Sequence, residues 1–157
     1  MHIPYCLSPC FYCGCARIIT HDRSKASAYL ARLQREIGIV ARHFDCGRSL
    51  AQLHFGGGTP NFLDVEQLLD LIGSIGRNFS FSTARDREFG IELDPRFCDE
   101  NYARRITEAG INRVSIGVQD FDPTVQETVN RVQSVDDPAA PSVRYRTRIV
   151  GYGAFQP

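Results

Sequence analysis

The chain is organised around the stretch HIPYCLSPCFYCGC, which spans residues 2–15. This stretch holds four of the six cysteines in the sequence, at the spacing C-x3-C-x2-C-x-C. Cysteines so close along the chain are poorly placed to pair with one another as structural disulfides, and no stretch of the sequence resembles an export signal. We therefore interpret these cysteines as ligands of a metal or an iron–sulfur cluster in a reducing compartment.

Length and composition are those of an ordinary globular domain. The 157 residues suffice for one domain with a sizeable core, and 43% of them are hydrophobic and 23% charged. Lys and Arg together number 18, as do Asp and Glu, so the formal net charge is zero. This balance gives no electrostatic reason to expect a nucleic-acid partner. No apolar run is long enough to cross a bilayer, so we expect no membrane partner and a cytoplasmic location.

Strand and helix patterns alternate along the chain. Strands are expected at residues 2–5, 50–55, 88–93 and 114–118. Helices are expected at residues 24–44, from 64 onward, at 100–109 and from 122 onward. Alternation of this kind needs crossover connections, and it predicts an α/β fold of about four βα units with a parallel sheet covered by helices.

Helix ends and buried faces can be predicted in more detail. We expect Ser24, Asp64 and Asp122 to be N-caps, with Gln67 completing a capping box and Gly110 ending the third helix. The first helix has an apolar stripe at three- and four-residue steps: Ala26, Tyr29, Leu30, Leu33, Ile37, Val40, Ala41 and Phe44. The expected buried face of the second helix is Val65, Leu68, Leu69, Ile72 and Ile75.

Residue types suited to ligand binding fall where the predicted strands end. The cysteine loop follows the first strand and GGGTP (residues 56–60) follows the second, while Glu92 ends the third and Gln119 the fourth. Ligands of parallel α/β folds bind at the carboxyl ends of the strands. Taken alone, each feature has a plain structural explanation. The glycines could form a tight turn, Glu92 could be a solvated carboxylate, and Arg131 could interact with the dipole of a nearby helix end. His54 alone is interpreted as structural. The shared placement favours a binding site.

The cysteine spacing favours an iron–sulfur cluster over zinc. Zinc motifs usually consist of two separated CxxC pairs, and this sequence has no second pair. Three thiolates at C-x3-C-x2-C would hold three corners of a [4Fe–4S] cube and leave one iron open to a ligand. Cys46 and Cys98 stand alone, and we interpret them as small apolar residues.

These motifs together resemble the radical S-adenosylmethionine (SAM) superfamily. Within it, residues 1–134 look like the oxygen-independent coproporphyrinogen III oxidases. The supporting stretches are residues 2–15, 52–60, 91–96, 112–121 and 130–134.

The resemblance implies a cofactor set and a reaction. It implies a [4Fe–4S] cluster on Cys6, Cys10 and Cys13, with SAM chelated by the open iron, and two SAM molecules in each active site. Cleavage of SAM would give a 5′-deoxyadenosyl radical, which takes hydrogen from a propionate of coproporphyrinogen III. Loss of carbon dioxide and an electron then gives a vinyl group, and two rounds give protoporphyrinogen IX. The implied electron donor is a flavodoxin or ferredoxin, and the implied oligomeric state is a monomer.

Individual site residues carry over from the resemblance. Gly57 and Glu92 match contacts to the first SAM. The second SAM is matched by Tyr12, Gly58, Thr59, Gln119 and Arg131. Cys15 matches a fourth cysteine of this branch that is not needed as a ligand. No catalytic residue is identified.

The sequence also departs from the family in ways that shape the expectations. The family fold continues into further βα units, so we expect a partial (β/α) barrel that lacks its C-terminal half. Residues 1–134 would form the partial core domain, which we expect to be inactive on porphyrinogen alone. The tail at 135–157 does not follow the family, and we expect it to be disordered or translated out of frame. The alternative function is that of the related haem chaperones, which bind and transfer haem; Cys15 and Asp120 favour the oxidase.

Overall fold

The computed structural model describes residues 1–45 and 47–133. Its centre is a parallel sheet with the strand order β1-β5-β7-β8. The strands are β1 (His2–Ile3), β5 (Gln52–Gly57), β7 (Glu88–Leu93) and β8 (Arg113–Ile116). A helix follows each strand: α1 (Lys25–Ala41), α2 (Val65–Asn78), α3 (Glu100–Glu108) and α4 (Pro123–Thr128). The predicted α/β fold of four βα units is confirmed.

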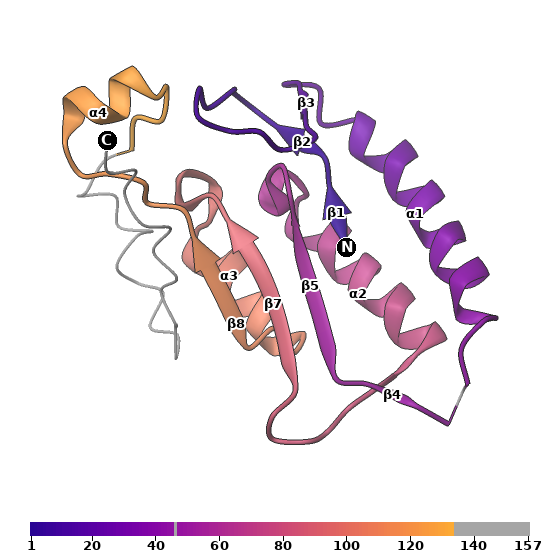
Figure 1. Cartoon of the computed structure of the whole chain (residues 1–157). Coiled ribbons are helices and arrows are strands. Elements are labelled where there is room, and N and C mark those ends of the chain that lie inside the picture. The colour runs from indigo at the N-terminus through magenta and orange to yellow at the C-terminus, as the bar shows by residue number, and fades with distance from the viewer. Residues whose placement is uncertain (46, 134–157) are drawn as a thin grey trace.

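Smaller elements connect these units. Short parallel pairs are formed by β2 (Tyr5–Cys6) with β3 (Ile18–Ile19), and by β4 (Ser49–Leu50) with β6 (Ser80–Phe81). Two 3₁₀ turns, Pro60–Phe62 and Pro95–Phe97, follow β5 and β7. Figure 1 shows α2 and α3 behind the sheet and α1 at the right beside α2, whereas α4 and the β2–β3 segment lie beyond the carboxyl ends of the strands.

Strand boundaries differ from the prediction where proline and glycine act. Strand β7 has the predicted bounds. The predicted first strand is divided at Pro4: β1 pairs with β5, and after Pro4 the chain pairs with β3 instead. A proline cannot donate to the sheet, but its carbonyl accepts from Ile18 N at 2.7 Å. Strand β5 runs on through Gly57 because its glycines stay paired with β1, and β8 ends at Ile116 rather than at residue 118.

Helix caps are largely as predicted. The capping box of α2 is present, with Gln67 N donating to Asp64 Oδ1 at 2.8 Å and Asp64 N donating to Gln67 Oε1 at 3.2 Å. Asp122 Oδ1 caps α4, and Gly110 has a φ of +100° after α3. The prediction for Ser24 was wrong: it precedes α1, but its hydroxyl donates to Asp22 Oδ1 at 2.5 Å, so it does not cap the helix.

The core lies between the sheet and the helices. Phe89, Ile91 and Leu93 of β7 are buried against the helices as their alternation predicts. On α2 the buried side chains include Leu68, Leu71, Ile72 and Ile75, whereas Leu69 is only half-buried. On α1 the predicted stripe holds through Ile37, but Val40 and Phe44 are exposed. The helix ends at Ala41 rather than at the predicted residue 44, so Phe44 lies outside it.

The cysteines outside the loop are only partly described. Cys98 is buried, as expected of a small apolar residue, and burial raises its pKa to about 11. Cys46 and residues 134–157, which include the predicted tail, lie outside the described residues. Within the part of the chain that the structure describes, no helix is both long enough and apolar enough to span a membrane.

The capping box gives a stability prediction. Asp64→Ala removes the acceptor for Gln67 N at the start of α2, and we expect it to lower the free energy of unfolding by about 1 kcal/mol. The matched control is Asp70→Ala, because Asp70 is exposed on the same helix away from its cap. Urea unfolding measures both variants, and an equal effect of the two would contradict the capping role.

Candidate cofactor-binding rim

Four segments meet at the carboxyl edge of the sheet. They are the cysteine loop (residues 6–17), the glycine segment (residues 56–59), the turn after β7 and the segment around α4 (Figure 1). The glycine segment runs beside the chain that enters the cysteine loop, since Gly58 N donates to Ile3 O at 2.8 Å and Thr59 N donates to Tyr5 O at 2.9 Å. The predicted common rim is therefore present.

The glycines are required because no side chain fits. A β-carbon on Gly58 would lie 2.9 Å from both Pro4 C and Tyr5 O and 3.0 Å from Cys6 Sγ. Gly57 has a φ of +120°, and its β-carbon would lie 2.5 Å from Nδ1 of His2. The contacts of the Gly58 β-carbon with Pro4 C and Tyr5 O are with backbone atoms, which cannot move aside as a flexible side chain can. The segment is thus a close approach between two stretches of backbone, and more than a tight turn.

The three predicted ligand cysteines lie on this loop in different environments. Cys6 is buried, with Sγ 3.4 Å from Thr59 Oγ1, and Cys10 is buried, with Arg131 Nη1 donating to its Sγ at 3.5 Å. Cys13 is half-buried and accepts from Cys15 N at 3.5 Å, while Cys15 is exposed. Cys13 N donates to Cys10 O at 3.1 Å, which folds the loop back on itself.

The thiols favour a positively charged ligand group. Burial raises the pKa of the Cys6 thiol; the Thr59 hydrogen bond opposes this rise, and Cys13 and Cys10 add to it. Thiolates so placed need a bound cation to stay ionised. Among residues 1–45 and 47–133, no three His, Cys, Asp or Glu side chains are grouped as ligands of one metal ion. A cluster imposes a different demand, because each cysteine binds a separate iron; three sulfur donors on one loop fit that demand.

A buried ion pair joins the far end of the site to the cysteine loop. Arg131, which follows α4, is 8% exposed, and its Nη1 lies 3.2 Å from Oδ2 of Asp94, which is 4% exposed. Arg131 Nη2 also donates to Gly117 O at 3.0 Å, and Arg96 Nη2 donates to Asp94 Oδ2 at 2.6 Å. Arg131 therefore does more than answer a helix dipole, because its charge is held between a carboxylate and a cysteine sulfur.

Two further predicted residues lie around this pair. Gln119 has a φ of +67°, and a β-carbon on Gly117 would lie 2.8 Å from Gln119 Nε2 and 3.3 Å from Arg131 Nη2. Tyr12 is half-exposed beside Cys10, and its pKa is raised by burial, against the opposing charge of Arg131. The structure thus places Tyr12 and Arg131 beside Cys10, and it places Gln119 and Arg131 beside Gly117.

Sequence reasoning missed Asn61 and Asp94. Asn61 is buried, its Nδ2 donates to Asp94 O at 2.8 Å, and Asp94 N donates to its Oδ1 at 3.0 Å. This pair fixes the turn after β5 to the turn after β7. The sequence places both at the predicted rim, since Asn61 directly follows GGGTP and Asp94 directly follows β7, but it does not indicate that they bind each other.

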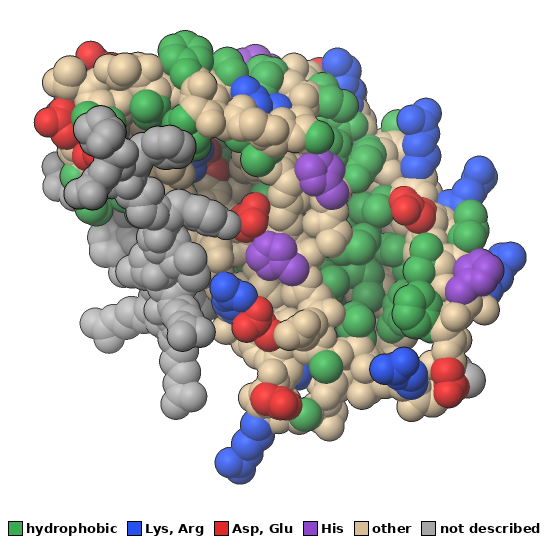
Figure 2. All heavy atoms as spheres, in the orientation of Figure 1, with side chains coloured by type: hydrophobic (Ala, Val, Ile, Leu, Met, Phe, Trp, Pro, Cys, Tyr) green, Lys and Arg blue, Asp and Glu red, His purple; other side chains and the backbone are tan. Residues whose placement is uncertain are grey.

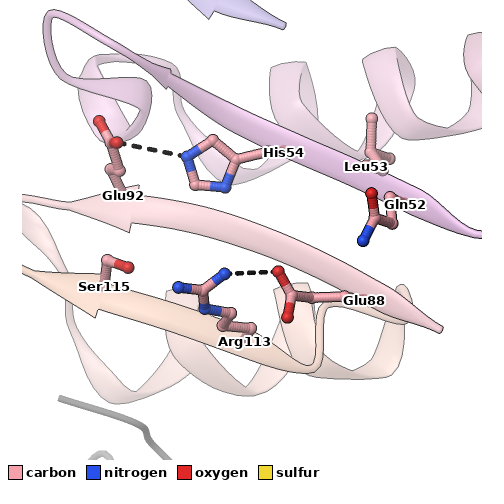
Figure 3. Close-up of a pocket in the computed structure, with 7 residues that line it drawn as sticks. All are labelled: Gln52, Leu53, His54, Glu88, Glu92, Arg113 and Ser115. Atoms are coloured by element: carbon pink, nitrogen blue, oxygen red, sulfur yellow. Dashed lines mark hydrogen bonds and ion pairs between the residues drawn. The ribbon is translucent and has the colours of Figure 1, made fainter. Parts of the chain in front are cut away.

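Glu92 lies on a different face of the rim. Among residues 1–45 and 47–133, no helix covers the other face of the sheet, which we call the helix-free face. This face carries a hollow of about 420 Å³, lined by Gln52, Leu53, His54, Glu88, Glu92, Arg113 and Ser115 (Figure 3). Figure 2 shows acidic, arginine and histidine side chains gathered there. His54 Nε2 lies 3.2 Å from Glu92 Oε1. His54, interpreted from the sequence as structural, is therefore a neighbour of Glu92, a predicted cofactor contact.

The fold and the cysteine–glycine rim define the class of protein. The family model of the radical SAM superfamily matches residues 1–139, so the chain belongs to this superfamily.

Curated relatives narrow the likeness. The chain is 44% identical over 152 residues to an oxygen-independent coproporphyrinogen III oxidase of Pseudomonas aeruginosa, a match that covers 94% of this chain and 33% of the relative. It is 43% identical to the enzyme of that name from Escherichia coli, over 85% of this chain and 28% of the relative. A solved structure of Escherichia coli coproporphyrinogen III oxidase, described as a radical SAM enzyme, matches with a TM-score of 0.80 and 43% identity, over 85% of this chain and 30% of that one. The chain thus spans about a third of the length of these relatives.

The close approach at Gly58 gives a prediction with a control inside the same site. Gly58→Ala forces its β-carbon into Pro4 and Tyr5, and we expect it to lower the free energy of unfolding by about 1–3 kcal/mol. Gly14→Ala, in the cysteine loop, is the control, because a β-carbon there meets nothing within 4 Å. Urea unfolding measures the free energy of unfolding of both variants. A Gly58→Ala variant as stable as Gly14→Ala would show that the backbone shifts to make room for the β-carbon.

The buried ion pair gives a second prediction. Asp94→Ala leaves the buried guanidinium of Arg131 without its carboxylate, and we expect a loss of about 3–5 kcal/mol in the free energy of unfolding. Glu108→Ala, which breaks the exposed pair with Arg104, should cost less than about 1 kcal/mol. Chemical denaturation followed by circular dichroism measures the free energy of unfolding of both variants. Similar losses would show that the buried pair of Asp94 contributes no more than an exposed pair.

Proposed function

We propose that this chain is the cofactor-binding part of a radical SAM oxidase that converts coproporphyrinogen III to protoporphyrinogen IX by oxidative decarboxylation of propionates to vinyls. The observation that carries the proposal is the packing of the glycine segment against the cysteine loop, with Cys6 Sγ 3.4 Å from Thr59 Oγ1 and no side-chain space at Gly58. The relatives reported above bear the name of this oxidase, and the haem chaperone alternative is not favoured.

In this proposal Cys6, Cys10 and Cys13 hold a [4Fe–4S] cluster. When bound, the cluster supplies the electron that cleaves SAM and so starts radical chemistry on the substrate. The protein contributes soft sulfur donors on one loop, and burial keeps two of them away from water. Cys15 is exposed and is not a ligand.

Two groups of residues would bind two SAM molecules. Gly57 and Glu92 would contact the first, with the carboxylate of Glu92 available to its ammonium group. The second would be contacted by Tyr12, Gly58, Thr59, Gln119 and Arg131. Support for the second group comes from the geometry, since Tyr12 and Arg131 lie beside Cys10 and Gln119 lies with Arg131 beside Gly117. The guanidinium of Arg131 can pair with a carboxylate. A flavodoxin or ferredoxin would deliver the electron, and a porphyrinogen would be the substrate.

Anaerobic reconstitution with iron and sulfide tests the proposal. We expect a brown protein with an iron–sulfur EPR signal after reduction, and we expect SAM to change that signal. Cys13→Ala should lose most of the bound iron, whereas Cys15→Ala should keep it, because only Cys13 is a proposed ligand. A zinc-only metal analysis, or equal iron loss in the two variants, would contradict the cluster. Tight stoichiometric haem binding without SAM cleavage would favour the chaperone.

A further inference from the structure

Two glycines on neighbouring strands leave room for a histidine and a carboxylate on the helix-free face. The register of β5 and β7 pairs His54 with Gly90 and Phe55 with Ile91, and Gly56 and Glu92 are the next residues on the two strands. A β-carbon on Gly90 would lie 2.9 Å from Nδ1 of His54. A β-carbon on Gly56 would lie 3.0 Å from Oε2 of Glu92. The side chain of His54 thus lies over Gly90 of the neighbouring strand, and that of Glu92 lies over Gly56, where no side chain is present.

The two side chains meet between these glycines. His54 Nε2 and Glu92 Oε1 are 3.2 Å apart, and the side chains are 48% and 42% exposed (Figure 3). A carboxylate accepts hydrogen bonds on both oxygens, so a bond from His54 at Oε1 leaves Oε2 for another donor. The other charged groups that line the hollow, Arg113 and Glu88, already pair with each other. His54 is therefore the hydrogen-bond donor that holds Glu92.

We propose that His54 is a positioning residue, which fixes the carboxylate of Glu92 so that Oε2 receives the ammonium group of the amino-acid part of SAM. The inference rests on the proposed function, because that function makes Glu92 a contact of SAM. Glutamate has several rotatable bonds, and ordering such a side chain on binding weakens affinity. A Glu92 that is ordered beforehand avoids this loss, so His54 acts on affinity for the amino-acid part of the ligand alone.

Two ligands that differ at the amino-acid end test the proposal. S-adenosylhomocysteine carries the ammonium and carboxylate groups, and 5′-methylthioadenosine lacks both. Equilibrium dialysis of the whole chain, reconstituted anaerobically with iron and sulfide, measures the Kd of each. We expect His54→Leu to weaken S-adenosylhomocysteine about threefold to tenfold and to leave 5′-methylthioadenosine unchanged. Glu92→Gln should show the same selectivity, and the double variant should be no weaker than Glu92→Gln alone.

Two polar substitutions separate positioning from folding. His54→Gln keeps an N–H donor near Nε2 and should restore most of the affinity, whereas His54→Asn is polar but too short to reach Glu92 and should behave like His54→Leu. Circular dichroism checks that each variant is folded. Because the side chain of His54 is half-exposed, we expect these changes to be tolerated.

The outcomes distinguish the positioning role of His54 from the proposed contact of Glu92 with SAM. Wild-type protein that binds the two ligands equally would overturn the proposed contact of Glu92 with SAM, and the role of His54 with it. A wild-type preference that His54→Leu and His54→Asn leave intact would overturn the positioning role alone. Loss of both ligands in a folded variant would also overturn it, because a general effect on the pocket is not selective for the ammonium group.

Discussion

The rim depends on the contact between the glycine segment and the chain that enters the cysteine loop. Gly58 and Thr59 donate to the carbonyls of Ile3 and Tyr5, and this pairing leaves no volume for a side chain at Gly58. Because Pro4 cannot continue the sheet, the chain turns there and places Cys6 against Thr59. The position of the first sulfur thus depends on backbone pairing and on the contact with the Thr59 hydroxyl, and the requirement for glycine at position 58 follows from the backbone pairing. A larger residue would separate the two parts that a cofactor must contact together.

A second constraint holds the opposite side of the loop. Arg131 is 121 positions from Cys10 in the chain, yet it contacts the sulfur of Cys10 and the carboxylate of Asp94. Two nearly buried charges are stable when they pair and are hydrogen-bonded. Arg96 donates to Asp94 and Arg131 Nη2 donates to Gly117 O, whereas Arg131 Nε has no hydrogen-bond partner among the described residues. Asn61 binds the backbone of Asp94 in turn, which joins the turns after β5 and β7. Phe11 N also donates to Val129 O, which joins the loop to the end of α4. Rigidity at the rim therefore comes from polar contacts, while the apolar core lies under the helices.

The sequence was sufficient where local chemistry decides the structure. Asp64 with Gln67, Asp122 before Pro123, and the alternation in β7 each specify their element within a few residues, and the strand ends then predict a common rim. It was insufficient where contacts join distant positions. Nothing near Asn61 or Asp94 indicates that they bind each other, and nothing near His54 indicates Glu92, because such pairs depend on strand register. Leu71 was absent from the predicted buried face of α2, and the hydroxyl of Ser24 donates to Asp22 instead of capping α1.

The helix-free face of the sheet explains why the rim suits a ligand. Parallel sheets are usually covered on both faces, and their strands then read as continuous apolar runs. In β7, by contrast, buried Phe89, Ile91 and Leu93 alternate with Glu88, Gly90 and Glu92. In a (β/α) barrel the face opposite the helices is the interior, which branched apolar side chains normally fill. In this structure, glycines and paired polar groups occupy the corresponding face, so it carries a polar hollow in place of a packed apolar interior. Glu92 stands at the carboxyl end of that space, so one carboxylate faces both the hollow and the rim.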